Sequence, residues 1–130
     1  MSRICFGKQS YRLARCRDDV DVIITDSPLP LTIIYNSNPA IDNSLPKLVM
    51  DVYNTYNNIN FFINRVKPYN PKGRNQTEEE SDELSEKIVD LCNNYGIEYL
   101  TVDGSTRGYE TIVKFVWNIL QNLHPTKFPI

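Results

Sequence analysis

The feature that most constrains the fold is the alternation of short, β-branched apolar runs with longer stretches of helical periodicity. The apolar runs predict three strands, which cover Val20–Ile24, Ile59–Asn64 and Tyr99–Val102. Between and around these runs, apolar residues recur at intervals of three and four, as on the inner face of a helix. Alternating strands and helices favour a parallel sheet with helical crossovers. We therefore predict an α/β fold in which a short, mainly parallel sheet is flanked by helices.

The predicted helices occupy residues 3–17, 45–56, 77–95 and 106–123. Thr77 and Glu80 fit the capping box that begins a helix, and Gly96 is a typical residue just past a helix end. Three strands make a thin sheet, because a doubly wound domain normally has more. The sequence contains no internal repeat and no linker, so its 130 residues predict a single domain, 1–130.

Composition excludes several classes of protein. The net charge of -2 does not suit a general nucleic-acid-binding protein, which needs an excess of Lys and Arg. No apolar run approaches the roughly 20 residues of a membrane span, and no signal peptide is visible. Cys5, Cys16 and Cys92 have no paired spacing, which predicts reduced thiols and no metal site. We therefore expect a cytoplasmic protein, with His124 on a surface tail.

A basic segment directly precedes an acidic one in the stretch RVKPYNPKGRNQTEEESDE, which runs from Arg65 to Glu83. Its cations are Arg65, Lys67, Lys72 and Arg74. The segment 65–77 follows the second predicted strand, and Asp26 and Asp103 follow the other two. Open α/β sheets bind ligands at the carboxyl ends of their strands. The alternatives stay open: Asp26 and Asp103 could begin turns, the basic segment could be a solvated loop, and the acids a solvated helix face.

Several stretches resemble the P-loop nucleoside and nucleotide kinases. The similarity is to a phage and bacterial group of AAA-like ATP-binding proteins related to the ribosylnicotinamide kinase domain. It rests on DVIITDSPL, LPKLVMDVYNTYNNINFFINR, KPYNPKGRNQTEEES and YLTVDG, and covers most of Val20 to Leu120. The resemblance implies ATP and Mg²⁺ as cofactors. It implies that Asp26 holds a magnesium-bound water or accepts a proton from a substrate hydroxyl.

The same resemblance implies that the basic segment 65–77 is a lid-like loop over ATP. Its phosphate-facing, nucleotide-binding residues would be Arg65, Lys67, Lys72 and Arg74. The kinases, however, begin with a phosphate loop of the form G-x-x-x-x-G-K-[ST], and this sequence has none. The chain thus resembles the later two thirds of such a kinase, a truncated P-loop-kinase-like domain. Without the amides and lysine of that loop, we expect no catalysis from this chain alone.

Three interpretations of function follow. We favour a kinase remnant, encoded by a phage, that binds a nucleotide without turnover or that binds and inhibits a host protein. Its partners would then be itself or a host protein, in the host cytoplasm. The alternative is an ATP-dependent nucleoside or nucleotide kinase, or an ATPase, whose phosphate loop is missing from this chain. The third interpretation is a misassigned start or a split gene, which would omit the first part of an ordinary kinase-like domain.

Overall fold

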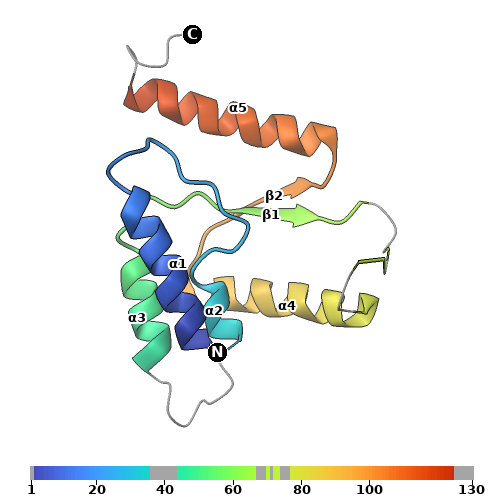
Figure 1. Ribbon diagram of the computed structural model, residues 1–130. Coiled ribbons are helices and arrows are strands. Elements are labelled where there is room, and N and C mark those ends of the chain that lie inside the picture. Colours follow the sequence, from blue (N-terminus) through green and yellow to red (C-terminus); the bar gives the residue numbers. More distant parts are fainter. Residues whose placement is uncertain (1, 36–43, 67–69, 71, 74–76, 125–130) are drawn as a thin grey trace. The chain divides into compact units, whose positions relative to one another are not determined.

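The computed structural model describes residues 2–35, 44–66, 70, 72–73 and 77–124. In chain order, the elements of this part (Figure 1) are α1 (Ser2–Cys16), α2 (Leu31–Ile34), α3 (Ser44–Tyr53), β1 (Phe61–Asn64), α4 (Glu78–Tyr95), β2 (Leu100–Asp103) and α5 (Thr106–Leu123). The described residues are mostly helical, and β1 and β2 form a two-stranded parallel sheet. The α/β class with a short parallel sheet and helices is confirmed at this level.

The chain divides into two compact units. The first, here called the helical unit, comprises Met1–Asn58 and Glu83–Ile97. The second, the sheet unit, comprises Ile59–Asp82 and Glu98–Ile130. Helix α4 therefore contributes its first turn to the sheet unit and the rest of its length to the helical unit.

The core of the helical unit lies among α1, α2 and α3, which contact one another. On α3, Leu45, Val49 and Tyr53 recur at intervals of four and are all buried, so they share one face of the helix. Phe6 of α1 and Leu29, just before α2, complete this cluster. Burying a side chain such as Val49 or Leu29 completely contributes about 1.5–3 kcal/mol of hydrophobic stabilisation.

Helix α4 begins and ends as its sequence predicts. At its start, the Thr77 amide donates to the Glu80 carboxylate (3.2 Å) and the Glu80 amide donates to the Thr77 hydroxyl (3.2 Å). This is the reciprocal capping box. At its end, Gly96 has a φ of 64°, and the Ile97 amide donates to the Cys92 carbonyl at 2.9 Å. This bond pattern is a Schellman motif, in which glycine takes up the left-handed backbone without a steric penalty.

Strands β1 and β2 confirm the second and third predicted strands. They pair in parallel from Phe61 opposite Leu100 to Asn64 opposite Asp103. The segment that joins them contains α4, as the predicted strand–helix–strand order requires. Helix α5 packs against β2, and the rings of Phe61 and Phe115 meet edge to face with centroids 5.7 Å apart. Such an aromatic pair adds about 0.5–1.5 kcal/mol beyond the area that it buries.

The first predicted strand is wrong. Residues Val20–Ile24 lie in an irregular segment, and their side chains are exposed, Ile24 to 90%. A β-branched apolar run favours a strand, but a strand also needs a neighbour for its backbone hydrogen bonds. Within the described residues, no segment pairs with this one. The sequence also did not predict α2, a single turn that follows Pro30.

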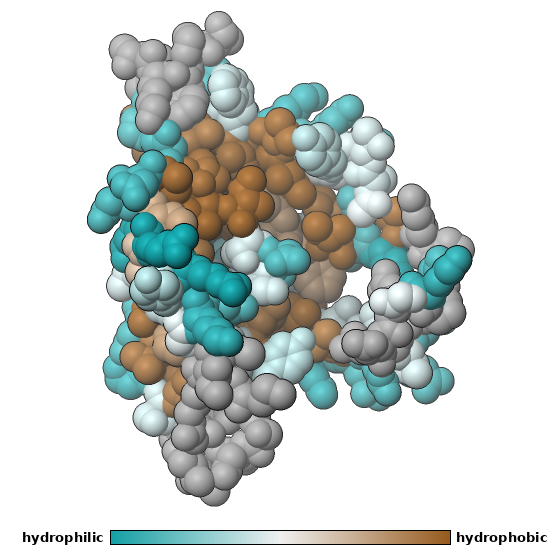
Figure 2. Space-filling view, in the orientation of Figure 1, coloured by the Kyte–Doolittle hydropathy of each residue, from teal (hydrophilic) through white to brown (hydrophobic). Residues whose placement is uncertain are grey.

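Many large apolar side chains of both units are exposed, as the brown areas on the face shown in Figure 2 illustrate. On α5 these are Tyr109, Val113, Phe115, Trp117 and Leu123. Ile112, Val116, Ile119 and Leu120 of the same helix are half-buried, and Gly108 is its buried residue. Large exposed apolar side chains in such number are typical of proteins that bind a partner.

Candidate functional site

The carboxyl ends of β1 and β2 lie side by side in the sheet unit. Asn64, the last residue of β1, is opposite Asp103, the last residue of β2. The Gly104 amide donates to the Asn64 carbonyl at 2.8 Å, so the two chain segments stay together for one residue beyond the sheet. From this edge β1 continues into Arg65 and the basic segment, and β2 continues into the turn before α5. This is the edge at which parallel sheets bind ligands.

Two glycines let the turn after β2 close tightly. A Cβ atom on Gly104 would lie 3.1 Å from the Asn64 carbonyl oxygen. A Cβ atom on Gly108 would lie 1.8 Å from the Asp103 carbonyl oxygen, a distance that no side chain tolerates. The Ser105 hydroxyl caps α5 by accepting from the Gly108 amide at 3.3 Å. The first turn of α5 is therefore held directly against the end of β2.

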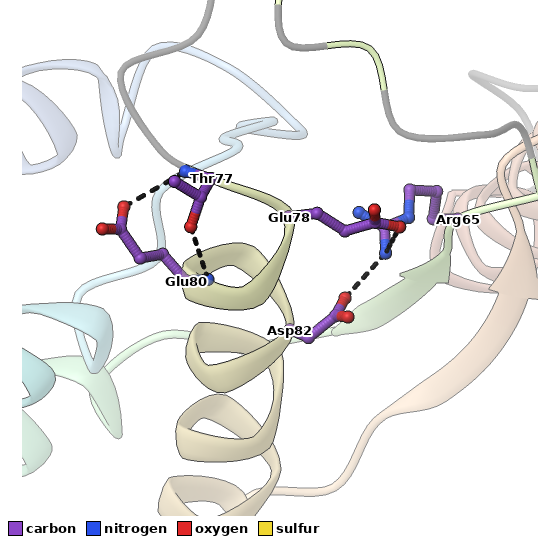
Figure 3. Close-up of polar contacts among 5 residues, drawn as sticks. All are labelled: Arg65, Thr77, Glu78, Glu80 and Asp82. Atoms are coloured by element: carbon purple, nitrogen blue, oxygen red, sulfur yellow. Dashed lines mark hydrogen bonds and ion pairs between the residues drawn. The ribbon is translucent and has the colours of Figure 1, made fainter.

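Arg65 is paired with two acids of α4. Its Nη2 atom lies 2.6 Å from Oδ1 of Asp82 and 3.7 Å from Oε1 of Glu78 (Figure 3). Glu78 and Asp82 are four residues apart, so they point from the same face of the helix. This pairing explains part of the basic–acidic order in the sequence: the acids that begin α4 bind the first cation of the segment before it.

The capping box brings this acidic face into position. Figure 3 shows Thr77 and Glu80 bonded to each other on one side of the helix start, and Arg65 with Glu78 and Asp82 on another. The three glutamates of the first turn also complement the positive end of the helix dipole. The acidic run therefore acts partly as the predicted cap and partly as a partner for Arg65, which the sequence analysis did not foresee.

Lys72 is exposed and lies in a turn. Its amide donates to the Asn70 side-chain oxygen at 3.0 Å, and Gly73 follows with a φ of 77°. Asn and Gly are the residues that such turns favour. The described part of the chain offers no ion-pair partner to the Lys72 ammonium group. Lys67 and Arg74, the other two predicted phosphate-binding residues, lie outside the described residues.

Asp26 belongs to the helical unit and is exposed. It follows the irregular segment that replaces the first predicted strand, next to a turn in which the Ser27 amide donates to the Thr25 hydroxyl at 3.1 Å. Its predicted catalytic role therefore remains a prediction. A single exposed carboxylate fits a magnesium ion that is held mainly by nucleotide phosphates and water. Among the described residues, no group of three or more His, Cys, Asp or Glu side chains could hold a metal ion.

Two cysteines have side chains in the described part of the chain. Cys16 and Cys92 are free thiols. Burial raises the pKa of the Cys92 thiol above its ordinary value. A raised pKa keeps this thiol protonated at neutral pH, and the protonated form is a poor nucleophile.

Comparison with known proteins adds no family assignment. No protein family, no curated protein and no solved structure matches this chain. None of the described helices combines the length and apolar character that a bilayer crossing requires.

Proposed function

We propose that this chain binds a phosphate-bearing small molecule, a nucleotide in the first place, at the carboxyl edge of the β1–β2 sheet. One observation carries the proposal. The two parallel strands end together, and the basic segment leaves the sheet at that edge through Arg65. A ligand at this edge would lie where parallel sheets generally place their ligands.

The chemistry of the segment suits a phosphate group. Guanidinium and ammonium groups form charge-assisted hydrogen bonds with phosphate oxygens, and these bonds are about twice as strong as neutral ones. Lys72 presents its ammonium group to solvent, and Arg65 lies at the base of the segment. Lys67 and Arg74 add two further cations from the sequence. Because the net charge of the chain is -2, its affinity for an anion has to come from a local group of cations.

The resemblance to P-loop kinases supports a nucleotide as the ligand and extends the proposal. In this interpretation the protein is a phage-encoded kinase remnant, with ATP and Mg²⁺ as the cofactors that the kinases use. The role that the resemblance gives Asp26, toward the metal or the substrate, stays a prediction, because Asp26 belongs to the helical unit and the carboxyl edge of the sheet to the sheet unit. Because the sequence contains no phosphate-loop motif, we propose binding without phosphoryl transfer by this chain alone. The alternative is an active nucleoside or nucleotide kinase, or an ATPase, whose phosphate loop comes from another segment.

Calorimetric titration with ATP and with inorganic tripolyphosphate tests the proposal. We expect Lys72→Ala to weaken binding by about 1.5 kcal/mol, or roughly tenfold in Kd, the lower end for a hydrogen bond to a charged group. Arg74→Ala should have an effect of the same sign. Lys114→Ala is the matched control, since Lys114 is an exposed lysine of α5 more than two turns beyond the start of that helix.

The outcomes separate the alternatives. Equal Kd values for the Lys72 and Lys114 variants would make the basic segment an ordinary solvated loop and overturn the proposal. Affinity should also fall as ionic strength rises, because the site is exposed and salt screens it. Magnesium-dependent turnover of ATP by the purified chain, lost in Asp26→Asn, would favour the kinase alternative.

A second candidate function is protein binding, with a second copy of the chain or a host protein as the partner. The observation that favours it is the exposed apolar surface of Val20–Ile24 and of α5. Both segments carry large apolar side chains that monomeric proteins usually cover.

A further inference from the structure

Arg65 connects the two ends of the basic segment. It is the first residue after β1, and its guanidinium group reaches Asp82 and Glu78, which lie in the first two turns of α4. We call the three residues the Arg65 clamp. All three belong to the sheet unit, so the clamp is a local feature of that unit.

Within the clamp, the two acids already bind Arg65, a cation that the proposed ligand would need. The Asp82 carboxylate takes up a donor of the guanidinium fork at 2.6 Å, and Glu78 adds a second negative charge at 3.7 Å from the same nitrogen. A phosphate group that binds Arg65 must therefore compete with these carboxylates for it. Lys72 has no such competitor among the described residues.

The clamp is also weak enough to exchange its partner. The Arg65 side chain is 35% exposed and the Asp82 and Glu78 side chains are each 58% exposed. Ion pairs this open to solvent contribute little to stability, because water screens the charges and holding two long side chains in one geometry costs entropy. A phosphate group carries more charge than one carboxylate and offers three acceptor oxygens, so it can replace Asp82 as the partner of Arg65.

We propose that Asp82 sets the affinity of the site by competition: the incoming phosphate group takes Arg65 from Asp82, with Glu78 as a weaker second competitor. This inference rests on the proposed function. The opposite role is that Asp82 orients Arg65 toward the ligand and so aids binding. The two roles predict opposite signs for the loss of the Asp82 charge.

Three single variants, each also combined with Arg65→Gln in a double-mutant cycle, decide between these roles. Asp82→Asn removes the competing charge and keeps the shape of the side chain. Glu79→Gln removes one charge from the same helix start, at an exposed residue that has no ion pair with any described residue. Glu78→Gln removes the more distant competitor. The Kd for ATP and for inorganic tripolyphosphate is measured by calorimetry at one ionic strength for each variant, with and without Arg65→Gln.

We expect Asp82→Asn to lower Kd by about two- to fivefold relative to Glu79→Gln, the range that corresponds to an exposed ion pair. Glu78→Gln should lower Kd less. In the Arg65→Gln background the advantage of Asp82→Asn should vanish, because the cation for which the acid competes is gone. Binding that appears only in Asp82→Asn would equally support competition.

Other outcomes overturn the inference. If the ligands bind but Asp82→Asn equals Glu79→Gln or binds more weakly, competition is wrong while phosphate binding stands. If neither ligand binds the natural chain or any variant, the proposed function fails and the competition fails with it. If Asp82→Asn still lowers Kd in the Arg65→Gln background, the affinity depends on the total charge near the ligand, and the pairing of Asp82 with Arg65 plays no part.

Discussion

Gly108 is the glycine whose neighbours leave the least room for a side chain. It lies in the first turn of α5, where a side chain would collide with the carbonyl oxygen of Asp103 at the end of β2. Glycine in a helix normally costs up to about 1 kcal/mol relative to alanine. Here the absent side chain lets the helix approach the strand. That contact fixes the carboxyl edge of the sheet, where the candidate site lies.

Gly108→Ala should therefore destabilise the sheet unit by about 2 kcal/mol or more, because overpacking at this contact outweighs the gain in helix propensity. Urea unfolding followed by the fluorescence of Trp117, the single tryptophan of the chain, reports on α5 directly. Gly7→Ala is the control: Gly7 lies in α1 with open space around its Cβ position. That change should stabilise by about 0.5–1 kcal/mol, measured by circular dichroism. Equal effects of the two changes would contradict the packing argument.

At the scale of elements, α4 performs several tasks at once. Its first two turns supply the partners of Arg65, its capping box fixes where the helix starts, and the Schellman motif at Gly96 ends it. Leu91 is buried, and Ile97, just beyond the helix end, packs against the core of the helical unit. A shift of the helix start by one residue would rotate Glu78 and Asp82 away from Arg65, since successive residues point about 100° apart.

Thr77→Ala should cost about 1 kcal/mol, because the Glu80 amide loses its side-chain acceptor at the helix start. Thr77→Ser keeps a hydroxyl at this position and should behave nearly as the natural chain does. Hydrogen exchange of the Glu80 amide, followed by NMR, measures the loss locally. If the serine and alanine variants exchange at the same rate, the hydroxyl does not cap the helix.

At the scale of the whole molecule, exposed apolar surface is the main feature that contacts among the described residues do not explain. A sheet of only two strands is rarely stable by itself, and parallel sheets are normally covered on both faces. Here Ile63 and Leu100 of the sheet are 59% and 45% exposed, and Ile24 is 90% exposed. The division into two compact units means that neither builds a large core.

We therefore predict that the chain associates with itself or with another protein. Static light scattering should show a mass that rises with protein concentration. Ile24→Lys should lower this association by placing a charge on the exposed apolar segment, whereas Asn94→Lys adds the same charge at an exposed polar position and should not. A constant monomer mass over the whole concentration range would contradict the prediction.

Much of the local structure could be predicted from the sequence. The capping pair Thr77 and Glu80, the helix end at Gly96 and the strands after Ile59 and Tyr99 all follow from interactions within a few residues. Their parallel pairing also followed, because strand–helix–strand order leaves few alternatives. For the candidate site, the sequence predicted that a group of cations directly follows a strand, and no more than that.

Tertiary structure alone decided which groups meet. The run Val20–Ile24 has the composition of a strand, but no described strand pairs with it, and it is irregular and exposed. From the sequence, the acids after the basic segment were predicted to cap a helix. Only the folded sheet unit brings Asp82 to Arg65, which is 17 residues away in the sequence. The sequence did not indicate why residue 108 is glycine, because the atom that excludes a side chain there is the Asp103 carbonyl oxygen. Local chemistry is determined by neighbours along the chain, whereas pairing and close packing depend on segments that folding alone brings together.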